Sequence, residues 1–550
     1  MKFQQDIKDG TSFGTSLLQL AGASLPLAET VGFYRVLEGF YNDSPELRNR
    51  LEDSLQRDGL TSLPMVASLV DSNLLEKMQE ALKDSPSLIS LFELWRQRIP
   101  SDSGKMIRRK LSPGISLRLP PLPLILQKCL DQFEIGLTAN YAAPNGQGSA
   151  VASIKTLEGI LLGDQEAYPQ EGTYITEGGG TNGIYTVLQY LNTRFPGSTI
   201  LCCGPNYFQF FENTRTAFTV INRDAQNGGL VNFLPTPAEV EAELTPAAKF
   251  LVITQPNNPT GEFYSKQDLE KLVQTAKDRN LLIIDDAAFE ELPFPSERSK
   301  FYSVAQVAYK LGALDRVVTI KSFSKGKNLP GERVGYVITS NPGFIRFLAD
   351  SMITQRDCPS NLNSGMICLD SILRYVELET QQGADLDSAI RSAVELFPQG
   401  MRVVGLPINR KLAEVYIQQR QADMTAYEKS FEYLNAPARR SGIIDGISRA
   451  TSAYNVLIKL PKLPRGMSMF QYAVNLFLEY GLETQWGPNF DKDTKKWEQK
   501  YGPWMRVTFS SDVPYLSDSF ERIWKSFESL GSKTKEVFQT PLFGQPDIGK

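Results

Sequence analysis

The chain has 550 residues, a formal charge of −4 and a hydrophobic fraction of 41%, which is enough apolar material for more than one domain with a substantial core. It contains no histidine, and this excludes triads, metal sites and general bases that depend on imidazole. Proton transfers would therefore fall to lysine, carboxylate, tyrosine or water. The cysteines show no metal-ligand spacing, which predicts reduced thiols and a cytoplasmic protein (Cys129, Cys202, Cys203, Cys358 and Cys368).

The first part of the chain, residues 1–118, is predicted to be a helical N-terminal extension. Within residues 1–98, apolar residues recur at spacings of three and four between Pro, Gly, Asp and Ser, as in short amphipathic helices. The basic run Lys105 to Lys110, followed by LSPG and RLPPLP, is expected to join this extension to the rest of the protein. Because the whole chain is mildly acidic and no aromatic platform accompanies the run, we expect no binding to nucleic acid.

The sequence also argues against a membrane protein. No run approaches the ~20 apolar residues needed to cross a bilayer. The amino terminus, MKFQQDIKDG, lacks the apolar core of a signal peptide.

Two predicted strands in the middle of the chain end in polar residues. The strand Phe250 to Thr254 leads into the turn NNPTG, and the strand Leu281 to Ile284 delivers Asp285 and Asp286 at its carboxyl end. In an open parallel sheet, ligands bind at this edge. A buried aspartate there could keep a pyridine nitrogen protonated, and a protonated pyridine is the electron sink that carbanion chemistry requires.

The segment KSFSKGKNLPGERVGY has the features of a Schiff-base site. It connects two predicted core strands, Arg316 to Ile320 and Val334 to Thr339, and connections of this kind often carry catalytic groups. Lys325 would supply the amine that condenses with an aldehyde. The hydroxyls of Ser322 and Ser324 and the guanidinium of Arg333 would hold a phosphate on the same ligand.

In this order and spacing, the segments resemble the fold-type I pyridoxal-phosphate enzymes of the class I/II aminotransferase family, over roughly residues 119–530. The resemblance implies an α/β fold with a doubly wound, mainly parallel large domain and pyridoxal 5′-phosphate as cofactor. It makes Lys325 the internal-aldimine lysine and Arg333 the phosphate-binding arginine. Asn258 matches the asparagine that hydrogen-bonds the phenolic oxygen of the cofactor and lies next to the substrate.

The same resemblance assigns further cofactor contacts. In EGGGTNGIY, Gly179, Gly180 and Thr181 match the glycine-rich turn whose backbone amides cradle the phosphate at a helix start. In TILCCGPNYFQF, Tyr207 matches an aromatic residue that stacks on the pyridine ring.

Two more matches concern the substrate and the subunits. In GPWMRVTFS, Arg506 matches the arginine that forms a bidentate pair with the α-carboxylate of the substrate. In NYAAPNGQG, Tyr141 matches a tyrosine that reaches the phosphate of the neighbouring subunit, so the resemblance implies a homodimer.

The chain departs from the family pattern at one cofactor contact. The family has aspartate, two residues, then tyrosine, and here the match is Asp286 with Phe289. A second register pairs Asp285 with Ala288, and it also lacks the tyrosine hydroxyl. We prefer Asp286, because adjacent strand residues face opposite sides and this register keeps an aromatic ring in place. Loss of the hydroxyl is expected to raise the pKa of the aldimine.

The predicted domains follow from these assignments. Residues 148–398 would form the large cofactor-binding domain, and residues 119–147 together with 399–530 a small α+β domain. The second part of the small domain contains a strand in SAYNVLIKLP, an amphipathic helix in MFQYAVNLFLEYG and the turn WGPNF. Residues 531–550 would be a C-terminal tail.

The resemblance implies transamination between an amino acid and a 2-oxo acid, with Lys325 as covalent anchor and base. Three alternatives stay open. A lyase or synthase would expel a β- or γ-substituent, and a decarboxylase or oxidase would use the same electron sink. A regulator that binds the cofactor without catalysis is the alternative from a different class.

Overall fold

The structure is a computed structural model and describes residues 109–116, 118, 142–212, 216–223, 225–227, 229–355, 359–404, 407–436, 443–463, 467–511 and 513–529. The helices expected within residues 1–98 and the tail expected at residues 531–550 lie outside these ranges. Among the described residues, no helix combines the length and the apolar character that a bilayer crossing demands.

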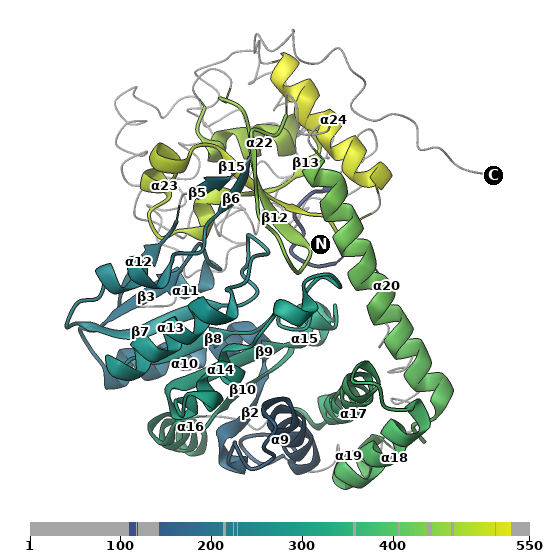
Figure 1. Cartoon of the computed structure of the whole chain (residues 1–550). Helices are drawn as coiled ribbons and strands as arrows, with labels where there is room; N and C mark the ends of the chain where they lie inside the picture. The colour runs from purple at the N-terminus through teal and green to yellow at the C-terminus, as the bar shows by residue number, and fades with distance from the viewer. Residues whose placement is uncertain are drawn as a thin grey trace, which may run out of the picture.

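A seven-stranded sheet forms the centre of the larger part of the protein (Figure 1). All of its strands run parallel except β10, which is antiparallel to both of its neighbours. In spatial order, the strands are β2 (Thr173–Glu177), β10 (Val334–Thr339), β9 (Val317–Ser322), β8 (Leu282–Asp286), β7 (Ala248–Thr254), β3 (Thr199–Cys203) and β4 (Ala217–Ile221). The strands expected from the hydrophobic runs before NNPTG, before Asp285 and on either side of the Lys325 turn are confirmed.

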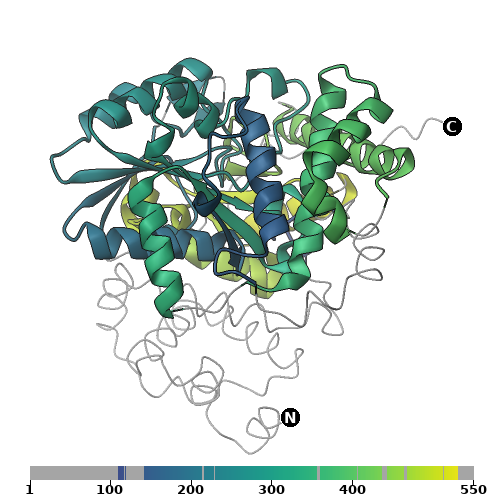
Figure 2. The ribbon, with the colours of Figure 1, turned by 90° about the horizontal axis from the view of Figure 1, so that it is seen from below.

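Helices cover both faces of this sheet, which explains why its strands are continuously hydrophobic (Figure 2). On one face, Val252 and Ile284 belong to the same apolar cluster as residues of α10 and α16. On the other face, Leu251 and Ile283 pack with residues of α13 and α14. The covering helices are α9 (Gly148–Leu162), α10 (Gly180–Arg194), α12 (Pro237–Ala242), α13 (Lys266–Asp278), α14 (Val304–Lys310), α16 (Pro342–Gln355) and α17 (Ser364–Gln381).

A second, six-stranded sheet forms the core of the smaller part. Its strands, in spatial order, are β14 (Gln485–Trp486), β15 (Trp504–Thr508), β12 (Asn455–Lys459), β11 (Gly446–Ser448), β6 (Leu230–Asn232) and β5 (Ala225–Asn227). The helices beside it are α22 (Met469–Tyr480), α23 (Thr494–Tyr501) and α24 (Val513–Ser529). The hairpin β5–β6 lies within residues 148–398, which were expected to form the large domain. Because β6 pairs with β11, the hairpin belongs to the smaller part.

Helix α20 (Arg410–Asn435) runs from the larger part to the smaller part (Figure 1). Its first half packs with α9 and α17 through Ala413 and Tyr416, whereas Met424 and Tyr427 further along join the apolar core of the smaller part. Helices α18 (Leu386–Leu396) and α19 (Pro398–Val404) precede it and pack against α17. The division between the two parts therefore falls inside α20 and not at residue 399.

The segment 109–116 differs from the expected helical extension. Strand β1 (Arg109–Lys110) pairs in parallel with β13 (Leu482–Glu483), and the residues after it continue without a helix. Leu111 extends the pairing, because its N–H donates to the Glu483 carbonyl at 2.8 Å. We call residues 109–118 the strap, of which all except residue 117 are described.

Two short helices complete the description, α11 (Gln209–Glu212) and α15 (Phe323–Gly326).

Candidate active site

Four of the predicted phosphate-binding residues converge at the start of α10. Gly179, the N-cap of α10, has φ of 69° and no side chain that caps the helix. A Cβ atom built on Gly179 would lie 3.6 Å from Ser322 Oγ, 3.5 Å from Ser324 Oγ and 3.6 Å from an Arg333 guanidinium nitrogen. The backbone N–H groups of Gly178 and Gly179 donate to the Arg333 carbonyl at 2.9 and 2.8 Å, which fixes the two loops against each other.

This arrangement has the chemistry of an anion site. Gly180 and Thr181 form the first residues of α10, where backbone N–H groups have no partner within the helix. The positive end of the helix dipole, two hydroxyls and a guanidinium then face one small space. Arg333 also adopts the left-handed backbone region, with φ of 55°, and such strain is frequent at ligand sites.

Lys325 lies in α15, between the two strands predicted for it, and its amine is partly buried. Its Nζ donates to the Gly114 carbonyl in the strap at 2.6 Å. Burial, together with the charges of Arg506 and Arg333, lowers the pKa of Lys325 to about 8, although Asp286 opposes the shift. At mildly alkaline pH, a substantial fraction of this amine is therefore deprotonated and nucleophilic.

The two adjacent aspartates at the end of β8 face opposite sides of the sheet. Asp286 pairs in register with Thr254 and Ile320, and the side chain of Ile320 faces the start of α10. Burial raises the pKa of Asp286 to about 6, against the opposing effects of the Ala288 N–H and of Lys325. Asp285 instead accepts a hydrogen bond from Thr319 at 3.0 Å on the other face.

Arg506 and Asn258 meet opposite Lys325. Arg506 lies on β15, is only 8% exposed and donates to Asn258 Oδ1 at 3.2 Å. Ser112 in the strap accepts from Arg506 through its hydroxyl at 2.6 Å and through its carbonyl at 3.2 Å. The guanidinium also lies over the Phe490 ring, 5.3 Å from its centroid. These contacts hold the guanidinium of Arg506 at the edge of the site.

Three further predicted cofactor residues lie in different surroundings. Tyr207 follows β3 and is partly buried, with its ring centroid 4.7 Å from that of Phe208. Phe289 is buried in the core of the smaller part, where its ring packs edge-on against Tyr454. Tyr141 lies outside the described residues.

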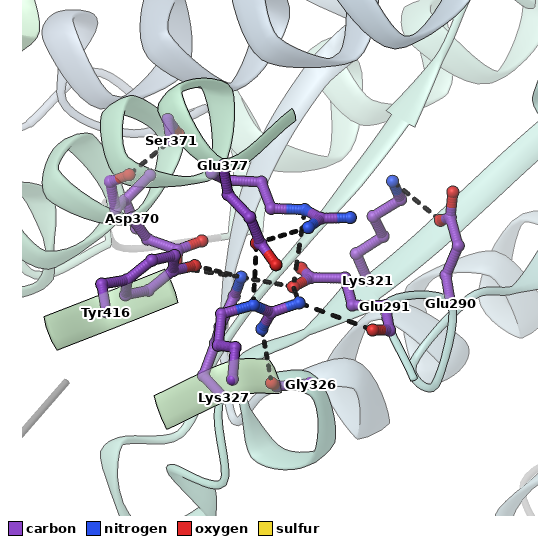
Figure 3. Close-up of polar contacts among 12 residues, drawn as sticks. Glu290, Glu291, Lys321, Gly326, Lys327, Asp370, Ser371, Glu377 and Tyr416 are labelled. Atoms are coloured by element: carbon purple, nitrogen blue, oxygen red, sulfur yellow. Dashed lines mark hydrogen bonds and ion pairs between the residues drawn. The ribbon is translucent and has the colours of Figure 1, made fainter. Parts of the chain in front are cut away.

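The two other lysines near Lys325 are engaged elsewhere (Figure 3). Lys321 Nζ contacts Glu158 at 2.7 Å and Glu290 at 2.8 Å, and despite burial these carboxylates raise the pKa of Lys321. Lys327 Nζ contacts Glu291 at 2.5 Å and Asp370 at 2.9 Å. Both ammonium groups are held by carboxylates and are poor nucleophiles, unlike the amine of Lys325.

Sequence analysis missed the two strap residues in the site. Gly114 lies 211 positions before the lysine that it contacts, and Ser112 lies 394 positions before Arg506. The turn signal Ser-Pro-Gly in LSPG marked a change of direction here, but a turn signal carries no information about distant partners.

Comparison with known proteins identifies the family. The model of aminotransferase class I and II matches residues 117–394, which is just over half of the chain. The chain belongs to this family. The resemblance noted from the motifs is thereby confirmed.

Relatives with curated names are similar to parts of the chain. It is 34% identical to the aspartate aminotransferase of Thermotoga maritima over 162 residues, 29% of this chain and 41% of that protein. It is 28% identical to the aspartate/prephenate aminotransferase of Thermus thermophilus over 255 residues, 45% of this chain and 60% of that protein. The matched regions thus span less than two thirds of these two relatives.

The fold extends further than the sequence similarity. The crystal structure of the aspartate aminotransferase of Thermotoga maritima matches 84% of this chain and 99% of its own, with a TM-score of 0.55 and 18% identity. The expected α/β fold of fold type I, with a mainly parallel central sheet, is confirmed. Family members depend on pyridoxal phosphate, and the chain's donor set fits that group: an anion cradle at a helix start, an amine with a lowered pKa and a carboxylate.

A first prediction concerns the charge that Arg506 exerts on Lys325. Arg506→Gln is expected to raise the pKa of Lys325 above about 8, because a neighbouring positive charge that disfavours the ammonium form is removed. The pH dependence of the rate at which an amine-reactive reagent labels Lys325, followed by peptide mapping of the cofactor-free protein, measures this pKa. Arg410→Gln, at an exposed ion pair on α20, is the control that should leave the midpoint in place. A midpoint unmoved by Arg506→Gln would contradict the assignment.

Proposed function

We propose that the protein transfers an amino group between an amino acid and a 2-oxo acid, with pyridoxal phosphate attached covalently to Lys325. When bound, pyridoxal phosphate supplies the electron sink that stabilises negative charge at the substrate Cα. The observation that carries the proposal is the position of Lys325. Its amine has a pKa of about 8, donates to the Gly114 carbonyl at 2.6 Å and lies within the electrostatic influence of Asp286, Arg506 and Arg333.

The proposed role of each residue follows from its charge and its position. Gly179, Ser322, Ser324 and Arg333 would hold the phosphate, and Asp286 would hold a proton on the pyridine nitrogen. Once the substrate amine has replaced it, Lys325 Nζ would be the base that accepts the proton of the substrate Cα and the acid that gives this proton back. Because the chain has no histidine, we assign both proton transfers to this lysine.

The substrate carboxylate would be bound by Arg506. A guanidinium fits a carboxylate with two parallel hydrogen bonds. In the structure, Arg506 donates to the Ser112 hydroxyl and to Asn258 Oδ1, which orient the guanidinium. An arginine in this role selects for α-carboxylates in general and leaves the choice of side chain to the surrounding pocket.

A panel of substrates tests the function. The holoprotein is incubated with single amino acids and 2-oxoglutarate, starting with aspartate because similar proteins are named for it. Transamination predicts one new 2-oxo acid and one new amino acid in equal amounts. Release of ammonia would indicate elimination, release of carbon dioxide would indicate decarboxylation, and either in place of amino transfer would overturn the proposal.

We further propose a homodimer in which Tyr141 of one chain completes the site of the other. Mixing Tyr141→Phe chains with Lys325→Ala chains is then expected to restore activity, because each hybrid dimer has one site with neither defect. Activity is measured before and after subunit exchange, with each variant alone as the control. Full activity of a monomer in size-exclusion chromatography would contradict the shared site.

A further inference from the structure

Six charged residues, all buried or partly buried, form a cluster of ion pairs next to the turn that carries Lys325, and Figure 3 labels four of them. Three are acidic and three are basic, so their formal charges cancel. The members of this ion cluster are Glu291, Lys327, Asp370, Arg374, Glu377 and Arg420. They come from the segment after β8, from the end of the Lys325 turn, from α17 and from α20.

Within the ion cluster, Lys327 fixes the end of the turn. Its side chain is 3% exposed, and its Nζ contacts the carboxylates of Glu291 and Asp370 and the hydroxyl of Tyr416 at 3.3 Å. Tyr416, on α20, also donates to Asp370 at 3.1 Å. The residue two positions after Lys325 is therefore held by three groups.

Arg420 contacts the backbone on both sides of this region. Its guanidinium donates to the Gly326 carbonyl at 3.3 Å and to the Glu291 carbonyl at 3.4 Å, and Gly326 is the residue directly after Lys325. A third hydrogen bond, 2.9 Å long, goes to Glu377, which is fully buried. Burial raises the pKa of Glu377, but Arg420 and Arg374 more than offset this and hold it at about 2, so the pairing is ionic.

The same helix also binds the strap. Tyr427, two turns beyond Arg420 on α20, donates to Ser116 Oγ at 2.6 Å. Asp423 pairs with Arg118 at 2.7 Å. The strap in turn places the Gly114 carbonyl 2.6 Å from Lys325 Nζ. Helix α20 thus contacts the backbone that carries Lys325 and the segment that carries its hydrogen-bond partner.

We propose that α20 positions the amine of Lys325, with Arg420 and Tyr427 as positioning residues that hold the lysine turn and the strap in register. This inference rests on the proposed function of Lys325. The planar guanidinium fixes its donors in a rigid fork, whereas an ammonium carries fewer donors on a flexible stem. Arg420→Lys therefore keeps the charge of the ion cluster and loses the geometry. A misplacement of about 1 Å in a reacting group can lower a rate by about a hundredfold.

The test uses Arg420→Lys, with Arg410→Lys as the matched control on the same helix. Arg410 is exposed and pairs with Asp387 and Glu414, neither of which belongs to the ion cluster. The readout is the rate at which cofactor-free protein binds pyridoxal phosphate covalently, followed by absorbance across pH. At high pH, where the amine is deprotonated, we expect Arg420→Lys to react at least about tenfold more slowly, and Arg410→Lys to match the unmodified protein.

The pH midpoint of that rate gives a second readout. Lys325 is faced by Asp286 from β8, by Arg506 from β15, by Arg333, and by the Gly114 carbonyl. Tyr427→Phe removes only the hydroxyl that holds the strap, so it remains informative if Arg420→Lys does not fold. Displacement of the Gly114 carbonyl would move the midpoint below about 8, because an acceptor for the ammonium form is lost.

The outcomes separate this inference from the proposed function. Slower reaction of Arg420→Lys at high pH, or a lowered midpoint in Tyr427→Phe, supports the positioning role. Variants that lose thermal stability but keep the rate and midpoint of the unmodified protein would show that α20 has a merely structural role. That outcome would overturn the positioning inference and leave the proposed function standing. If the unmodified protein forms no covalent link at Lys325, the proposed function falls and this inference falls with it.

Discussion

Replacement of Lys325 by alanine is expected to abolish transamination while leaving a folded protein. The side chain supplies both the covalent anchor and the base, and a positioned general base alone contributes about a hundredfold to ten-thousandfold to a rate. The loss should exceed that range, because both roles end together. Activity is measured as amino transfer to a 2-oxo acid, and folding by thermal melting.

The covalent link itself identifies the lysine. Borohydride reduction of the holoprotein followed by peptide mapping should place the cofactor on Lys325 and leave Lys321 and Lys327 unmodified, because carboxylates hold those two ammonium groups. Lys266→Ala, at an exposed ion pair with Glu270, is the control and should keep full activity. Label on Lys321 or Lys327 would refute the assignment.

The elements around Lys325 could be predicted from the sequence because their signals are local. Continuous apolar runs mark strands that are covered on both faces, and the residues at their carboxyl ends must then share one edge of the sheet. That reasoning predicted that Asp286 and Lys325 lie in one site. The glycine-rich turn before α10 was recognised by its likeness to a family, and the structure shows why glycine is required there: Gly179 has a positive φ.

The contacts that the sequence did not reveal join distant segments through single side chains. Lys327 lies two positions after Lys325 in the same turn, yet its partners Glu291 and Asp370 lie 36 and 43 positions away, on other elements. The spacing of these residues does not indicate that they are in contact, because a buried ion pair produces no periodic pattern in the sequence. The strap is similar, since Gly114 offers only a backbone carbonyl, which every residue has.

The hairpin β5–β6 was missed for a different reason. Each strand has only three residues, which is too short for a pattern of alternation to appear. Its pairing with β11 depends on how the two parts of the protein meet. Boundaries between such parts follow tertiary contacts, so the division inside α20 was also beyond the reach of local signals.

The adjacent aspartates provide the second large expected effect. Asp286→Asn is expected to lower the rate of amino transfer by roughly a hundredfold to a thousandfold, because a negative charge placed to stabilise a cationic group in the site becomes neutral. In the native protein the pKa of Asp286 is about 6, so this carboxyl is mostly ionised at neutral pH. A nearby cation would lower that pKa further and keep the charge in place.

Asp285→Asn is the matched control, because the same substitution is made one residue away on the opposite face of β8. Burial and the neighbouring Glu290 carboxylate raise the pKa of Asp285 well above its usual value. Asp285 accepts a hydrogen bond from Thr319, and because the amide oxygen of asparagine can accept the same hydrogen bond, little activity should be lost. Rates are compared per folded site, after cofactor content and melting temperature are measured. If Asp285→Asn were the severe change, the aspartate of the site would be Asp285, and the register that aligns Phe289 with the tyrosine position would be wrong.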